Sequence, residues 1–307
     1  MRCSKATKKR YYDFVSRVYV LNPGGGAPQT LQRILCNNEE KELQAVLEKN
    51  LDLLPGEQIN PDAPRRWLMV KREVPVPDPD SGSDSFSLDF LLADQDAVPT
   101  FVECKRFNDT RARRAVVGQM LDYAANGQYY WTKDELRTMA YETAKKLNTS
   151  LDDALKDLEL AEEFSSIDSF FERFYANLQQ GQVRIIFFLE DSSLQLRSIA
   201  DFLNKQMEQA EVLVVEARQY RHNDSRIIVP NLIGYTDQIR LSKKTVAVNR
   251  ASSRPPMTRE ALLASMIQRN HPSEVAKVAQ DIVSNLEHLG LATRSFPSCI
   301  NTGVQIS

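Results

Sequence analysis

Two apolar stretches, Phe86-Ser-Leu-Asp-Phe-Leu-Leu92 and Thr100-Phe-Val-Glu-Cys-Lys105, stand at the centre of the predicted fold. Each has the composition and alternation of a strand, and the polar residues 94–99 interrupt them. The two stretches therefore predict a β-hairpin. Side chains alternate across a strand, so Glu103 and Lys105 leave one face of the hairpin together.

Charged side chains converge on this hairpin. If it pairs Asp89 close to Glu103, two carboxylates meet Lys105, and hard oxygen ligands of this kind suit Mg²⁺ or Mn²⁺. An isolated E-x-K is more often a structural ion pair at a sheet edge. Here a helix follows with Gln119 and Tyr123 four residues apart on one face, which favours a functional site.

The order of these motifs resembles the PD-(D/E)xK nuclease superfamily. Its members carry an Asp on one strand, E-x-K on the next and, in RecB-like branches, Q-x-x-x-Y on the following helix. The resemblance covers residues 35–220 and implies an α/β fold with a restriction-endonuclease-like core, a mixed central sheet flanked by helices. Leu88 stands where many members have Pro, at a position that varies widely in the superfamily.

The resemblance implies a role for each motif residue. Asp89, Glu103 and the main-chain carbonyl of Cys104 would hold one or two Mg²⁺ or Mn²⁺ ions. Lys105 would position or deprotonate the attacking water, or stabilise charge on the phosphate. Gln119 and Tyr123 would contact Lys105 or the nucleic-acid backbone.

One further acidic residue is expected on a helix predicted over residues 39–50. This helix is similar to the opening helix of the NucS-like and Shedu-like branches, which commonly carries one. With Leu43, Val46, Leu47 and Leu51 as the buried stripe, a rotation of about 100° per residue puts Glu39 and Glu40 near its edges. Glu40 is our choice, as a residue that orients a metal-bound water.

The activity implied is Mg²⁺-dependent endonucleolytic hydrolysis of DNA phosphodiesters, in defence against foreign DNA or in DNA repair. The alternative is a catalytically silent, nuclease-fold protein that binds DNA or regulates a partner. RNA or branched DNA as the substrate, and a homodimer as the assembly, remain open from the sequence.

The net charge of −2 argues against a protein that coats nucleic acid by bulk electrostatics. Nucleic-acid binding would need a local basic patch instead. We expect this patch at Arg106, Arg111, Arg113 and Arg114, because these residues adjoin the E-x-K motif and arginine forks bind phosphate bidentately. A solvated basic face is an equal alternative for this run.

The length of 307 residues suits an α/β domain with a smaller second one. We expect an N-terminal extension over 1–34, a nuclease-like domain over 35–241 with a helical insertion around 132–180, and a linker over 242–257. Residues 258–307 suggest a small winged-helix-like module, or else a dimerisation or partner-binding appendage. Within the main domain, residues 183–217 read as a β-α-β unit with parallel strands.

Cysteine spacing, histidine positions and hydropathy limit other functions. The four cysteines lie too far apart for a metal knuckle, and their number is low for a disulfide framework. The three histidines stand outside the motifs, against His-based chemistry. The N-terminus lacks an apolar signal region, and no apolar run of about 18 residues occurs. We therefore expect a cytoplasmic protein with no membrane partner and reduced thiols.

Overall fold

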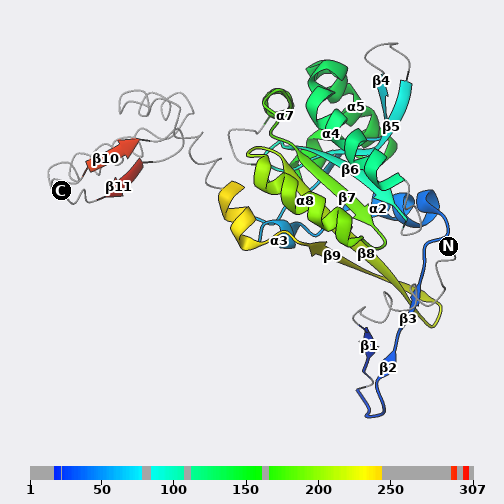
Figure 1. Cartoon of the computed structure of the whole chain (residues 1–307). Helices are drawn as coiled ribbons and strands as arrows, with labels where there is room; N and C mark the ends of the chain where they lie inside the picture. The colour runs from blue at the N-terminus through cyan, green and yellow to red at the C-terminus, as the bar shows by residue number, and fades with distance from the viewer. Residues whose placement is uncertain are drawn as a thin grey trace, which may run out of the picture. The chain divides into compact units, whose positions relative to one another are not determined.

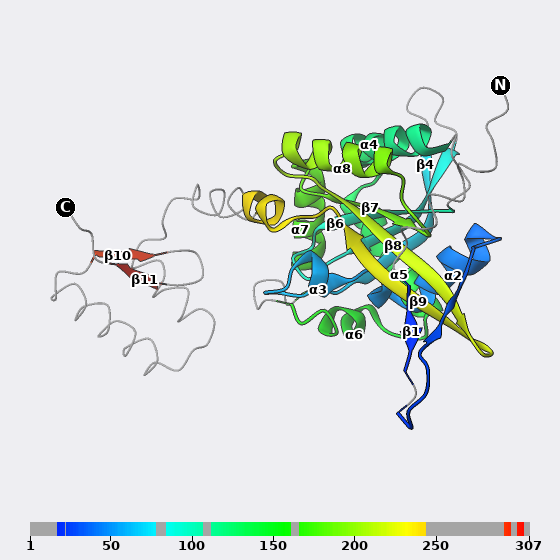
Figure 2. The same cartoon turned by 60° about the horizontal axis from the view of Figure 1, so that its bottom comes forward.

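The computed structural model describes residues 17–21, 23–77, 84–106, 112–160, 166–243, 292–295 and 300–303 (Figure 1). The chain divides into two compact units, residues 1–240 and 241–307. In the first unit, a seven-stranded mixed sheet carries helices on both faces (Figures 1 and 2). The mixed α/β architecture with a central sheet, expected from the sequence, is confirmed.

The central sheet has the strand order β3-β8-β7-β6-β5-β4, and β9 pairs with the other side of β8. Its strands are β3 (Gln32–Ile34), β4 (Leu68–Pro77), β5 (Asp84–Ala93), β6 (Pro99–Lys105), β7 (Arg184–Leu189), β8 (Glu211–His222) and β9 (Ser225–Ile233). The β6–β7 and β7–β8 pairs are parallel, and the other pairs are antiparallel. A separate short hairpin joins β1 (Tyr19–Val20) to β2 (Gln29–Thr30).

Both predicted supersecondary units are confirmed. β5 and β6 form the antiparallel hairpin, with Phe90 opposite Val102. β7, helix α8 (Leu194–Gln206) and β8 form the parallel β-α-β unit. The hairpin adds antiparallel strands to this parallel core, which makes the sheet mixed.

Helices cover the two faces of the sheet unequally. One face packs against α8 and four helices from the middle of the chain: α4 (Ala112–Tyr130), α5 (Lys133–Lys146), α6 (Leu151–Lys156) and α7 (Ile167–Gln179). The last three lie within the segment 132–180 that we expected to be helical. The other face packs against short helical segments: η1 (Glu40–Gln44), α2 (Ala45–Lys49), η2 (Leu51–Leu53) and α3 (Gly56–Ile59).

Described segments near both ends of the chain bear on the expected domain boundaries. β3 falls in the segment 1–34 and pairs with β8, so the sheet takes in residues that we expected to precede the domain. In the second unit, β10 (Ala292–Ser295) and β11 (Ile300–Gly303) form an antiparallel hairpin. The rest of the winged-helix-like module expected over 258–307, and the linker expected over 242–257 from residue 244 on, lie outside the described residues. Within the described ranges, no helix has the length and apolar character needed to cross a membrane.

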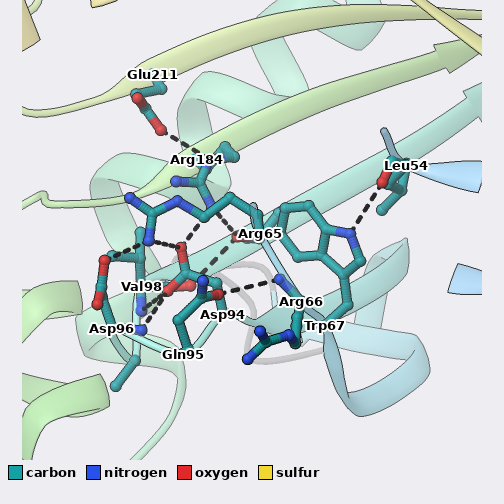
Figure 3. A network of polar contacts seen from close by, with 12 residues as sticks. Leu54, Arg65, Arg66, Trp67, Asp94, Gln95, Asp96, Val98, Arg184 and Glu211 are labelled. Atoms are coloured by element: carbon teal, nitrogen blue, oxygen red, sulfur yellow. Dashed lines mark hydrogen bonds and ion pairs between the residues drawn. The ribbon is translucent and has the colours of Figure 1, made fainter. Parts of the chain in front are cut away.

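A buried ionic network fixes the hairpin at the end of β6 away from Lys105 (Figure 3). The Arg184 guanidinium donates to Asp94 Oδ2 at 2.9 Å and to Glu211 Oε2 at 2.7 Å. Asp94 Oδ1 also accepts from the backbone N–H of Val98 at 3.0 Å, which closes the β5–β6 turn. Since Arg184 and Asp94 are both buried, this network holds β5, β6, β7 and β8 in register.

Candidate active site

The site begins where the β5–β6 ladder ends. Phe90 and Val102 are the last paired residues, and Asp89 and Glu103 come next along the two strands. The Cys104 N–H donates to Asp89 Oδ2 at 2.7 Å, in place of a main-chain carbonyl of β5. β5 therefore leaves the ladder at Asp89, and the carboxylate lies beside the free edge of β6.

The main chain of Cys104 faces the same side as Asp89. The Lys105 carbonyl accepts from the Glu190 N–H across β7, at 3.4 Å. Hydrogen-bonding direction alternates along a strand, so the N–H and carbonyl of Cys104 both point toward β5. The Cys104 carbonyl, which the sequence suggested as a metal ligand, thus faces the gap that holds the Asp89 carboxylate.

Glu103 and Lys105 share one face of β6, as the alternation predicts. Lys105 Nζ lies 3.1 Å from Glu103 Oε1. Glu103 Oε2 is buried and has no hydrogen-bond partner among the described residues. Burial and the nearby Asp89 raise the pKa of Glu103 to about 7. A buried carboxylate oxygen without a donor, next to a second carboxylate, is unfavourable. A bound cation would coordinate that oxygen and offset the repulsion between the two carboxylates.

Glu39, rather than Glu40, reaches the site. Its carboxylate accepts from Lys105 Nζ and from the Arg106 N–H, at 3.0 Å each. Glu40 is exposed and makes no contact with the site among those that the structure describes. Burial lowers the pKa of Lys105, but the nearby Glu103 and Glu39 raise it by more, so the pKa lies above its ordinary value. Lys105 is therefore protonated at neutral pH.

The choice between the two glutamates depends on the helix type. Residues 40–44 form a turn of π-helix, whose hydrogen bonds join residues five apart. The rotation of about 100° per residue, which put both Glu39 and Glu40 near the edges of the buried stripe, assumed an α-helix. In the wider turn, Glu39 aligns with Gln44, five residues later, and both side chains reach the site.

Gln44 is a site residue that the sequence analysis missed. Its Nε2 donates to Asp89 Oδ1 at 2.8 Å, while its Oε1 accepts from Arg72 Nη2 at 3.4 Å. Burial raises the pKa of Asp89, and the hydrogen bonds from Cys104 and Gln44 oppose that shift. One signal could have found it, namely a glutamine next to the buried stripe of Leu43 and Leu47.

Gln119 and Tyr123 lie together on α4, and their side chains are hydrogen-bonded to each other. Tyr123 is fully buried, and burial raises its pKa to about 12, with smaller contributions from Glu103 and Asp89. A contact of either α4 residue with Lys105, which we expected, is not among those that the structure describes.

The predicted nucleic-acid patch is only partly described. Arg106 follows β6, and its Nη1 donates to the Asn37 carbonyl at 2.8 Å. Arg111 lies outside the described residues. Arg113 and Arg114 fall in the first turn of α4, but their side chains are outside the description.

A small pocket opens beside Lys105 between α4 and α8. Lys105, Arg106, Asp191 and Ser193 contribute its polar lining, and buried apolar side chains, including Phe187, complete it. The pocket therefore adjoins the ionisable cluster at the carboxyl end of β6 and β7. Ligands of α/β sheets commonly bind at this end of parallel strands.

The donor set fits a hard divalent cation whose coordination shell includes water. Asp89 and Glu103 offer carboxylate oxygens, and Cys104 offers a carbonyl facing Asp89. Among the described residues, no three His, Cys, Asp or Glu side chains gather as a metal-binding group. Mg²⁺ is commonly bound by one or two carboxylates and keeps several waters, so two carboxylates and a carbonyl suffice.

Comparison with known proteins gives no match. No protein-family model matches the chain, and neither the search of curated proteins nor that of solved structures finds a similar one. The geometry of the described residues therefore carries the functional argument.

Proposed function

We propose that this chain is a metal-dependent nuclease of the PD-(D/E)xK type that hydrolyses DNA phosphodiesters. One observation carries the proposal: Asp89 and Glu103 stand where the β5–β6 ladder opens, with Lys105 against Glu103 at 3.1 Å. The mixed sheet with helices on both faces also supports a restriction-endonuclease-like core. A role in defence or repair is part of the same proposal.

Asp89, Glu103 and the Cys104 carbonyl would hold Mg²⁺ or Mn²⁺. Such an ion supplies a Lewis acid for the phosphate oxygens and lowers the pKa of water. The unpartnered Oε2 of Glu103 supports this assignment, since a buried carboxylate oxygen needs a donor or a cation.

Lys105 acts in this proposal as a cation. In the metal-free protein, Glu103 and Glu39 raise the pKa of Lys105 and favour the ammonium form. A fixed positive charge next to the scissile phosphate stabilises the negative charge that develops on its oxygens. Lys105 would thus donate hydrogen bonds to the phosphate. No covalent intermediate with the protein is required.

Glu39 and Gln44 orient these groups. Glu39 holds the Lys105 ammonium at 3.0 Å, and Gln44 holds Asp89 Oδ1 at 2.8 Å. Both come from the helical segment at residues 39–44, which packs on the face opposite α4. Glu39 takes the place that we first gave to Glu40 as the additional acidic residue.

The test is a cleavage assay with purified full-length protein. Plasmid, linear duplex and single-stranded DNA are incubated with Mg²⁺ or Mn²⁺, with EDTA as the control. We expect cleavage by the native chain, loss of cleavage in EDTA, and loss in Glu103→Gln and Lys105→Met variants that remain folded. Cleavage by Lys41→Gln, an exposed position on the same helical segment, should match the native chain.

The alternative is a catalytically silent DNA-binding or regulatory protein of the same fold. Folded protein that binds DNA and Mn²⁺ but cuts none of these substrates would favour it over the nuclease. Equal cleavage by the Glu103→Gln variant would reject the assigned site altogether.

A further inference from the structure

We infer that the three-stranded ribbon at one end of the sheet binds the backbone of duplex DNA. The ribbon comprises β3, residues 218–222 of β8 and residues 225–229 of β9. In Figures 1 and 2 the β8–β9 hairpin extends beyond the helices, with β3 beside it. The choice of DNA as the partner rests on the proposed function, while the binding surface rests on the charges described below.

Two exposed arginines oppose each other on this ribbon. Arg221 of β8 and Arg226 of β9 are directly paired across the strands. Like charges in this arrangement repel and destabilise a sheet. Arg226 has only a distant ion pair, 3.8 Å from Glu42, and Arg221 has no ion pair among the described residues. An anionic partner would convert this repulsion into attraction.

The other arginines of the ribbon are already compensated. Arg33 lies 3.0 Å from Asp191, and Arg218 lies 2.7 Å from Glu216. Arg33 lies opposite Tyr220, two residues from Arg218, so Arg33 and Arg218 share one face of the sheet. Arg221 is the next residue along β8 and lies opposite Arg226, so these two arginines point to the other face. The available positive charge thus lies on one face of the hairpin.

The charge pattern of the sequence also favours an anionic partner. The first 38 residues, which lead through β3, contain seven basic residues and one acidic residue, in a chain whose net charge is −2. Segregated positive charge of this kind attracts phosphate through counterion release. The charge of these residues therefore fits the phosphates of duplex DNA.

The ribbon lies close enough to the site to bind the same duplex. Five residues separate Ile34, the end of β3, from Glu39, whose carboxylate contacts Lys105. Even fully extended, five residues span only about 17 Å. Gln219 Nε2 also donates to the Glu42 carbonyl at 3.1 Å, which ties β8 to the helical segment. DNA held by the ribbon can therefore reach Lys105.

The experiment measures binding of a fluorescent duplex in EDTA over a series of salt concentrations. The test variant is Arg221→Gln/Arg226→Gln. The matched control is Lys145→Gln/Lys146→Gln, which removes two exposed charges from the end of α5. We expect the test variant to bind more weakly, with a salt slope shallower by about 0.9 for each phosphate that the variant no longer neutralises. The control should bind as the native chain does.

Thermal unfolding separates binding from a structural role. Because the substitutions relieve a repulsion, the melting temperature of the test variant should equal or exceed that of the native chain. An unchanged salt slope would overturn the inference, as would a lower melting temperature accompanied by weaker binding. Native protein that fails to bind the duplex would also overturn it.

Failure of the nuclease proposal gives a different result. Since binding is measured in EDTA, ribbon-dependent binding without Mg²⁺-dependent cleavage would reject the nuclease and leave the binding surface. If Mg²⁺-dependent cleavage does not change in the ribbon variant, and the salt slope is also unchanged, the nuclease proposal stands and the ribbon is rejected as the binding surface.

Discussion

Glu39 and Gln44 stand five residues apart, and both side chains reach the cluster at the end of the β5–β6 hairpin. Glu39 accepts from Lys105 Nζ at 3.0 Å, and Gln44 donates to Asp89 Oδ1 at 2.8 Å. The π-helical turn over residues 40–44 makes this alignment possible, because its hydrogen bonds join residues five apart. One helical segment thus orients both ends of the site.

Replacement of Gln44 should weaken metal binding at Asp89. In Gln44→Ala, Asp89 Oδ1 loses its donor, so the carboxylate is free to rotate away from the gap beside Cys104. Outer-shell substitutions of this kind typically cost about 10–100-fold in metal affinity or activity. We expect such a loss in Mn²⁺ affinity, measured by calorimetry. Lys41→Ala, on the exposed side of the segment, is the control, and equal affinities in the two variants would contradict the role.

The stability of the metal-free protein should fall with rising pH. The pKa of Glu103 is raised from 4.5 to about 7, chiefly by burial and then by Asp89, and that of Asp89 is raised as well. Between these values the folded chain binds more protons than the unfolded chain, so the free energy of unfolding decreases as pH rises. Urea unfolding in EDTA from pH 4.5 to 7.5 measures this decrease.

The Glu103→Gln variant identifies the source of that decrease. Its amide does not titrate, so the stability of the variant should change less over the same range of pH. The control is Glu40→Gln, at an exposed position next to Glu39. Its stability should fall with rising pH as steeply as that of the native chain. A slope in Glu103→Gln as steep as the native one would show that other groups cause the dependence.

The Arg184 network should matter more to stability than exposed ion pairs do. Arg184→Ala leaves Asp94 buried with one partner fewer, and breaking a buried pair typically costs about 3–5 kcal/mol. Arg137→Ala, which breaks the exposed contact with Asp168, should cost at most about 1 kcal/mol. Urea unfolding of both variants measures the difference, and similar losses would contradict a special role for Arg184.

Sequence patterns predicted the parts of this molecule that depend on local periodicity. The β5–β6 hairpin and the β7–α8–β8 unit follow from alternation and from runs of apolar residues, and both are present. Glu103 and Lys105 share a face because strand alternation is insensitive to context. Their relation to Asp89 depends on where β5 leaves the ladder, which no local pattern specifies.

Long-range pairing accounts for what the sequence could not predict. β3 belongs to the sheet through its pairing with β8, although almost 190 positions separate Gln32 from Arg221. The Gln44 contact likewise joins residues 45 positions apart. The π-helical turn is also invisible to a helical wheel, which assumes a constant rotation per residue. Contacts of this kind arise from tertiary packing.

Glu39 and Glu40 offer a direct test of the site, because the two glutamates are adjacent and only one contacts Lys105. In Glu39→Gln, the amide can still meet Lys105 through its oxygen, but the charge that holds the ammonium is lost. Charged hydrogen bonds contribute about 1.5–3 kcal/mol, so we expect cleavage to fall by about tenfold or more. Glu40→Gln should cleave DNA at the native rate. The measurement is kcat/KM with saturating Mg²⁺, and a larger loss in Glu40→Gln than in Glu39→Gln would restore Glu40, our choice from the sequence, over Glu39 and its contact with Lys105.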